Sequence, residues 1–192
     1  MKRLLPLLLA AFLIGCNEVK DLGHYWDDAT PDTMLIGQWR GDDGYICEFE
    51  PSNRDLLLRE IAPTNATSKV IASLYFHTNE VTVRSITIKG YTFLLFKRPA
   101  GDGALCRYLV SSNQLVFSQL RDSVVEQGIR ANLVPGEIPE RFSYNSEKAS
   151  VPNPLTVGQS CQISLLDEKT MEFLTSKENA VYWDSLRSFT KQ

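Results

Sequence analysis

The sequence predicts a mainly β domain, either an antiparallel barrel or a strongly curved sheet of about eight strands, with two short helices near the C-terminus. Three observations support this fold class. Short runs of alternating apolar and polar residues begin near Ile36. Turn-forming Gly, Asp and Asn residues separate these runs at intervals of roughly 8–12 residues, as in barrels and sandwiches. Patterns with the period of a helix occur only late in the chain.

The first sixteen residues, MKRLLPLLLAAFLIGC, have the pattern of a secretory signal, with a basic start and an apolar stretch of about eleven residues. This stretch is about half the length that a membrane-spanning helix needs. Its end, Leu13-Ile14-Gly15-Cys16, resembles the bacterial lipobox. The resemblance implies transfer of a diacylglyceryl group to the Cys16 thiol, cleavage before Cys16 and acylation of the new N-terminus. A plain signal peptide that contains a cysteine is the alternative.

Asn17 follows the lipobox cysteine. In Gram-negative bacteria an Asp at this position resembles a signal for retention in the inner membrane, and Asn17 departs from it. We therefore expect the lipid on Cys16 to hold the protein in the outer membrane, facing the periplasm. Two or more acyl chains are enough for stable anchoring.

The chain divides into a signal peptide over residues 1–15, a lipidated N-terminus and polar tether over 16–33, and a β domain over 34–192. Loss of Lys2 and Arg3 with the signal changes the formal net charge from −3 to −5. Mild acidity without a basic block argues against nucleic acid as a partner. Within the tether, His24-Tyr25-Trp26 is either functional, as an aromatic recognition segment or an interfacial anchor, or a group that packs against the domain.

The first half of the β domain reads as strands joined by turns. Asp43-Gly44 predicts a hairpin whose second strand places Tyr45, Cys47 and Phe49 on one face. Strands are also predicted over Leu56–Ala62, Lys69–His77 (with Phe76 inward) and twice within Glu80–Arg98, with a bulge at Arg84-Ser85 and a bend at Gly90.

The second half adds the helices. Two strands follow the turn at Ala100–Gly103, and Tyr108 points inward on the first of them. Ser123 and Glu126 form the Ser-x-x-Glu pattern of a capping box, and Asp167 is the expected N-cap of a second helix. A long loop over Pro139–Gly158 lies between the helices, and strands are predicted over Cys161–Leu166 and Asp184–Lys191.

The order of these elements is similar to that of small lipocalin-like (calycin-type) bacterial lipoproteins of unassigned function. Gly37-x-Trp39 resembles the Gly-x-Trp near the first barrel strand of lipocalins, and the segments Tyr108–Ile129 and Ile163–Lys191 resemble the family's closing strands and helices. The resemblance implies a barrel and a cavity, and it supplies no catalytic residue.

Neither an enzyme nor a bound cofactor or metal is expected, because the catalytic and phosphate-binding motifs GxSxG, SxxK, HExxH, GxGxxG and the P-loop are absent. The odd number of cysteines after Cys16 leaves two interpretations, buried thiols that merely pack or one disulfide. Because the first and last strands of a barrel meet, Cys47 and Cys161 are the pair chosen for a disulfide.

Two hypotheses follow for function. In the first, the barrel binds a small apolar ligand or an envelope component, with Trp39, Tyr45, Phe76 and Tyr108 as the candidate lining of the cavity. In the second, the barrel is filled and the protein is an accessory subunit of an envelope protein complex. An enzyme is a third interpretation, for which the sequence shows no polar cluster.

Overall fold

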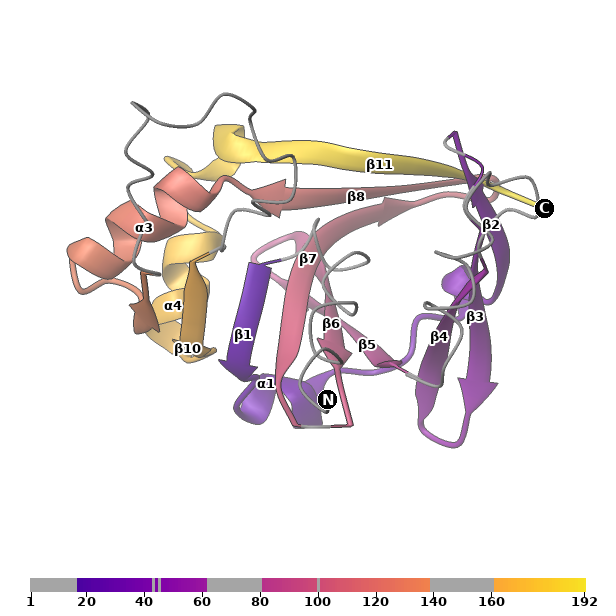
Figure 1. The fold of residues 1–192 in the computed structure, drawn as a ribbon, viewed down its shortest axis with the longest axis horizontal. Helices are drawn as coiled ribbons and strands as arrows, with labels where there is room; N and C mark the ends of the chain where they lie inside the picture. The colour runs from indigo at the N-terminus through magenta and orange to yellow at the C-terminus, as the bar shows by residue number, and fades with distance from the viewer. Residues whose placement is uncertain (1–16, 43, 45, 62–80, 100, 139–160) are drawn as a thin grey trace, which may run out of the picture.

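The computed structural model describes residues 17–42, 44, 46–61, 81–99, 101–138 and 161–192 (Figure 1). The described elements, in chain order, are β1 (Asn17–Asp21), α1 (His24–Asp28), the 3-10 turn η3 (Thr33–Leu35), β2 (Gly37–Gly41), β3 (Ile46–Ser52), β4 (Asp55–Ile61), β5 (Val81–Ile88), β6 (Tyr91–Lys97), β7 (Gly103–Val110), β8 (Gln114–Leu120), α3 (Asp122–Arg130), β9 (Gly136–Glu137), β10 (Gln162–Leu165), α4 (Glu168–Leu174), the 3-10 turn η4 (Ala180–Tyr182) and β11 (Trp183–Lys191).

Eight antiparallel strands close into a barrel, in the order β2-β3-β4-β5-β6-β7-β8-β11. Two pairings complete the ring: β6 pairs with β7, and the last strand β11 pairs with β2. The strands therefore encircle a common interior (Figure 1). The predicted fold class, including two short helices late in the chain, is confirmed.

The β5–β6 hairpin is built on a two-residue turn, Lys89-Gly90, in which both residues have positive φ (49° and 82°). Such turns match the twist of the flanking strands, so the predicted bend at Gly90 is confirmed. The predicted bulge at Arg84-Ser85 is wrong, because β5 and β6 stay in continuous register from Thr82 to Ile88. The alternation slips there because Ser85 follows Val83 in the inward phase and places its hydroxyl 2.7 Å from that of Tyr108, whereas Ile86 and Ile88 pack on the outer cluster.

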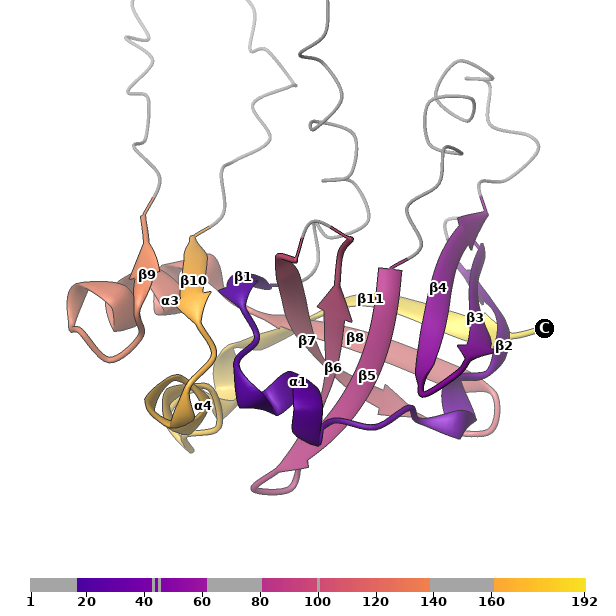
Figure 2. The same ribbon diagram turned by 90° about the horizontal axis from the view of Figure 1, so that it is seen from below.

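A short sheet of β1, β10 and β9 extends from the barrel at β7 and forms a second layer. One edge of β7 pairs with β6, whereas the other edge pairs first with β1 and then with β8. Strand β10 adds to β1 in parallel, and β9 adds to β10. Figures 1 and 2 show this short sheet together with α3 and α4 on one side of the barrel. Strand β10 is therefore not a barrel strand, and the chain returns to the barrel only at β11.

The wall formed by β6 and β7 separates two hydrophobic clusters. On β6, Leu94 and Phe96 belong to the interior cluster, while Phe93 and Leu95 belong to the outer cluster beneath the helices. Both faces of this wall are buried, as expected for a strand that reads as a continuous apolar run. The outer cluster is closed by side chains of β1, α3 and α4, namely Val19, Val125, Met171 and Leu174.

The prediction of a tether over 16–33 is wrong for residues 17–33, which are part of the fold. β1 pairs on both of its edges, and Val19 has no exposed surface. Leu22, Trp26 and Ala29 also belong to the outer cluster. The polar composition of the segment reflects its exposed face, while its few apolar side chains are buried.

The two late helices begin in different ways. Asp167 is the N-cap of α4, as predicted, and its side chain accepts a hydrogen bond from the Thr170 N–H (2.8 Å). In α3 the N-cap is Arg121, one residue before the helix, and it makes no side-chain capping hydrogen bond. The capping box predicted from Ser123 and Glu126 is therefore wrong, because Ser123 already lies within the helix.

Candidate functional site

The barrel interior contains two of the four residues predicted to line a cavity. Trp39 on β2 and Tyr108 on β7 both belong to the interior cluster, and both are almost completely buried. The Trp39 indole N–H donates to the Leu35 carbonyl oxygen (2.6 Å), which joins the first barrel strand to η3. Tyr45 and Phe76 lie outside the described residues.

Large apolar side chains from many strands meet in this interior. Those with less than 2% exposed surface include Trp39, Phe49, Phe96 and Phe189. Phe117 and Phe189 pack edge to face, with ring centroids 5.6 Å apart. Because an eight-stranded barrel is just wide enough for side chains to fill it or for one small ligand, side chains of this size occupy much of the available space.

One mouth of the barrel is crossed by the segment between α1 and β2 (Figure 2). The Tyr108 hydroxyl donates to Asp32 Oδ2 (2.7 Å). The Ser85 hydroxyl lies 2.7 Å from the same phenol oxygen, and since the tyrosine proton is given to Asp32, Ser85 is the donor there. Asp32 Oδ1 also accepts from the Met34 N–H, which caps η3. A polar network therefore ties the crossing segment to β5 and β7.

Sequence reasoning did not identify Asp32 and Ser85. The signal for Asp32 was its place before the short turn Thr33–Leu35, since an Asp at an N-cap accepts backbone hydrogen bonds. The signal for Ser85 was the slip in alternation on β5, a pattern that is also typical of a bulge.

We predict that Tyr108→Phe lowers the free energy of unfolding by roughly 1–2 kcal/mol at neutral pH, because the hydrogen bonds of Asp32 and Ser85 to the phenol are lost. Burial raises the pKa of Tyr108 above its ordinary value near 10, and the hydrogen bond to Asp32 acts in the same direction. A raised folded-state pKa favours the folded protein below about pH 10, and this contribution is lost as pH rises further. Urea unfolding of both proteins at pH 7, 9, 10 and 11 measures the effect.

The gap in stability between the wild type and Tyr108→Phe is expected to narrow above about pH 10. If the difference in free energy of unfolding between the two proteins stays constant from pH 7 to 11, the buried Tyr108 hydroxyl does not cause the loss of stability at high pH.

Trp26 packs against the domain and contacts two cationic side chains, which decides between a functional and a packing role for the aromatic segment. The Arg84 guanidinium lies 4.8 Å from the centroid of the indole ring, and the Lys97 ammonium lies 5.2 Å from it. Arg84 also donates to the Trp26 carbonyl oxygen (2.9 Å). Trp26 is buried, so it packs against the domain. His24 is exposed beside Tyr25, with ring centroids 4.2 Å apart.

Asn17, the residue after the predicted lipidation site, is 1% exposed. Its side-chain amide donates to the Leu120 carbonyl oxygen (3.1 Å), and its side-chain oxygen accepts from the Leu120 N–H (3.2 Å). Leu120 lies at the end of β8, beyond the part that pairs with β7, so Asn17 satisfies backbone groups that β7 no longer reaches. Cys16 itself lies outside the described residues.

The basis for a Cys47–Cys161 disulfide is wrong. Cys47 on β3 packs in the interior cluster, and so does Cys106, whereas Cys161 packs in the outer cluster. Cys161 directly precedes β10, which pairs with β1 and β9. The strand that meets the first barrel strand is β11, which carries no cysteine.

Within the described ranges, no group of three or more His, Cys, Asp or Glu side chains is placed to hold a metal ion. Helices in the same part of the chain lack the length and apolar character needed to cross a membrane. The closed eight-stranded antiparallel barrel is consistent with a calycin-like fold. Comparisons with protein-family models, curated proteins and solved structures found no match.

Proposed function

We propose that the chain is a lipoprotein of the outer membrane, acylated at Cys16 and facing the periplasm, that acts as a non-enzymatic subunit of an envelope protein complex. The observation that carries the proposal is the packed interior of the barrel. Trp39, Phe49 and Phe96 belong to the same interior cluster, and each is at most 1% exposed. A carrier of apolar ligands needs an open cavity at this place. A filled barrel serves as a rigid scaffold, and we expect it to bind its partner through its outer surface.

The outer face of β7 and β8 supports a role in binding a protein. Leu109 points away from the interior and is 65% exposed, and its partner across the ladder, Val116, is half-buried on the same outer face. A large exposed apolar side chain on a rigid strand is a suitable centre for a protein interface. This face defines the proposed partner surface, centred on Leu109 and Val116.

In-cell photocrosslinking of the full-length protein tests the proposal. A photoreactive amino acid replaces Leu109 in one variant and Arg59 in a matched control. Arg59 is exposed on β4, on the other side of the barrel (Figure 1). We expect a discrete adduct of constant mass from position 109 and none from position 59. Native mass spectra of the same protein, extracted in mild detergent, are expected to show no bound small molecule beside the acylated polypeptide and its protein partner.

Two results would contradict the proposal. Equal crosslinking from both positions, or none from either, would argue against a partner on the β7–β8 face. A reproducible extra mass of small-molecule size that is lost on denaturation would instead support a carrier of a small apolar ligand.

A further inference from the structure

Strand β1 begins at Asn17, the residue directly after Cys16, which is the proposed site of acylation. β1 pairs with β7 on one edge and with β10 on the other. Its first residue, Asn17, is fixed by two hydrogen bonds to the Leu120 backbone. Val19, two residues later, is completely buried. The chain is therefore held in place from the residue that directly follows Cys16.

Covalent geometry then fixes how far the domain can be from the lipid. The α carbon of Cys16 is about 3.8 Å from that of Asn17, and the thioether side chain adds a few ångströms. The headgroup layer on each side of a bilayer is about 5–7 Å thick, the difference between the full bilayer and its hydrocarbon core. Asn17 must therefore lie at the level of the headgroups or directly above them.

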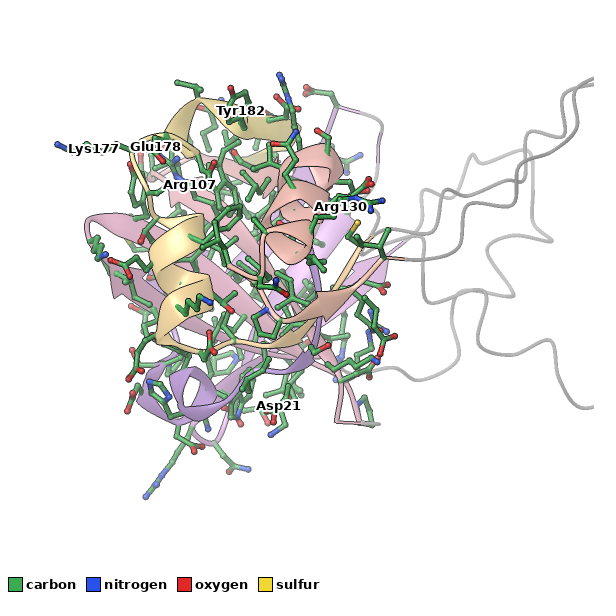
Figure 3. All side chains as sticks on the ribbon, turned by 90° about the vertical axis from the view of Figure 1, so that its left-hand side faces the viewer. Asp21, Arg107, Arg130, Lys177, Glu178 and Tyr182 are labelled. Atoms are coloured by element: carbon green, nitrogen blue, oxygen red, sulfur yellow. The ribbon has the colours of Figure 1, made fainter. Side chains whose placement is uncertain are left out.

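The contacts around Asn17 identify which end of the domain this is. Leu120, which bonds Asn17, is followed by Arg121, whose backbone N–H donates to the Tyr182 carbonyl oxygen (3.2 Å). The Arg121 guanidinium also lies 5.7 Å from the centre of the Tyr182 ring. Asp21, at the other end of β1, lies on the opposite side of the molecule from Tyr182 in Figure 3. The start of β1 thus lies next to the start of α3 and to η4.

The side chains of η4 suit the headgroup layer. Val181 is 74% exposed and Tyr182 is 40% exposed. Tyrosine is enriched where a membrane meets water, because its ring is apolar and its hydroxyl is polar. Arg121 is paired with Asp184 through two hydrogen bonds (2.8 and 2.9 Å), so their formal charges cancel. This end of the domain therefore offers an apolar and an aromatic side chain beside a paired arginine and aspartate.

We propose that the end of the domain formed by η4 and the starts of β1 and α3 lies in the headgroup layer of the bilayer that holds the acyl chains. Val181 and Tyr182 are the side chains that contact lipid. The proposal rests on acylation of Cys16, the first part of the proposed function. It places the opposite end of the domain, including η3, away from the membrane.

Fluorescence quenching in vesicles tests this orientation. The acylated full-length protein is reconstituted into phosphatidylethanolamine–phosphatidylglycerol vesicles that carry a headgroup-attached quencher. Val181→Cys and the control Met34→Cys are each labelled with an environment-sensitive fluorophore. Met34 is 49% exposed on η3. Cys47, Cys106 and Cys161 are at most 5% exposed, and the protein without an added cysteine checks that they take up no label.

We expect quenching at position 181 to exceed that at position 34 several-fold. Insertion of about twelve Gly and Ser residues between Cys16 and Asn17 adds a root-mean-square span of roughly 17–21 Å. This insertion is expected to reduce quenching at 181 to the level at 34. Equal quenching at both positions in the unmodified protein, or quenching at 181 that the insertion leaves unchanged, would overturn the proposal.

The mass of the N-terminal peptide separates this inference from the proposed function. An acylated Cys16 with equal quenching at both positions overturns only the orientation. A peptide without acyl groups contradicts the lipoprotein assignment, and the orientation fails with it.

Discussion

Removal of Cys16 is expected to transfer the protein from the membrane fraction to the soluble periplasmic fraction, with at least a hundredfold fall in the membrane-bound share. The change is made by replacing residues 1–15 with a secretion signal that is cleaved after a small-x-small site, together with Cys16→Ser. Each buried methylene of an acyl chain contributes about 0.8 kcal/mol to membrane binding, so the loss of two or more chains removes nearly all of it. Fractionation of cells that express each form, followed by immunoblotting, measures the ratio.

The control retains Cys16 and its own signal and carries Asn17→Gln, which keeps an amide at the position. It should remain with the membrane fraction, although the longer side chain disturbs the hydrogen bonds to Leu120. A Cys16→Ser protein that stays in the membrane fraction would show that a contact other than the lipid holds the domain there.

Local hairpin signals explain why most of the barrel was predictable from the sequence. Asp43-Gly44 predicted the connection between β2 and β3, and Gly90 predicted the turn between β5 and β6. Each signal concerns a few neighbouring residues whose backbone must turn, and antiparallel neighbours then pair without distant contacts. The final strand lacks such a clean pattern, because its apolar residues Trp183, Leu186 and Phe189 recur every third position across a shift of register with β8. It still pairs beside the first barrel strand, β2.

The N-terminal segment was not predictable because its burial depends on distant partners. Asn17 is buried by the backbone of Leu120, which is 103 residues away in sequence. Val19 is buried by the outer cluster, which also contains α3 and α4. A polar residue such as Asn17 gives no apolar signal, and five residues are too few for a period to stand out. A tether was therefore the natural interpretation of its composition.

The placement of β10 depended on the same distant contacts. Its sequence, Gln162–Leu165, reads as an ordinary strand and does not say which neighbour it pairs with. In the structure it pairs in parallel with β1, which the sequence did not identify as a strand. Because β1 was predicted to be part of a tether, β10 was predicted to be a barrel strand. The choice of Cys47 and Cys161 for a disulfide depended on that placement of β10. One sign of a second layer was present in the sequence, the unbroken apolar run Phe93–Phe96 on β6, which is typical of a strand buried on both faces.

The filled-barrel interpretation predicts that Trp39→Ala lowers the free energy of unfolding by about 3–5 kcal/mol. Trp39 has no exposed surface, and its loss leaves a cavity among large side chains that cannot collapse to fill it. The substitution also removes the hydrogen bond that the indole donates to Leu35, so the segment that crosses the barrel mouth loses one of its connections. Chemical denaturation followed by circular dichroism measures the change.

Trp183→Ala is the matched control, since Trp183 is only partly buried and packs its ring on Phe93 in the outer cluster. Its expected cost is about 1–2 kcal/mol, because less apolar surface is removed from contact and no enclosed cavity is formed. Costs of similar size at both positions would mean that Trp39 borders open space rather than a packed interior. In that case the barrel has room for a ligand, and the result would favour a carrier of a small apolar ligand over a subunit of a protein complex.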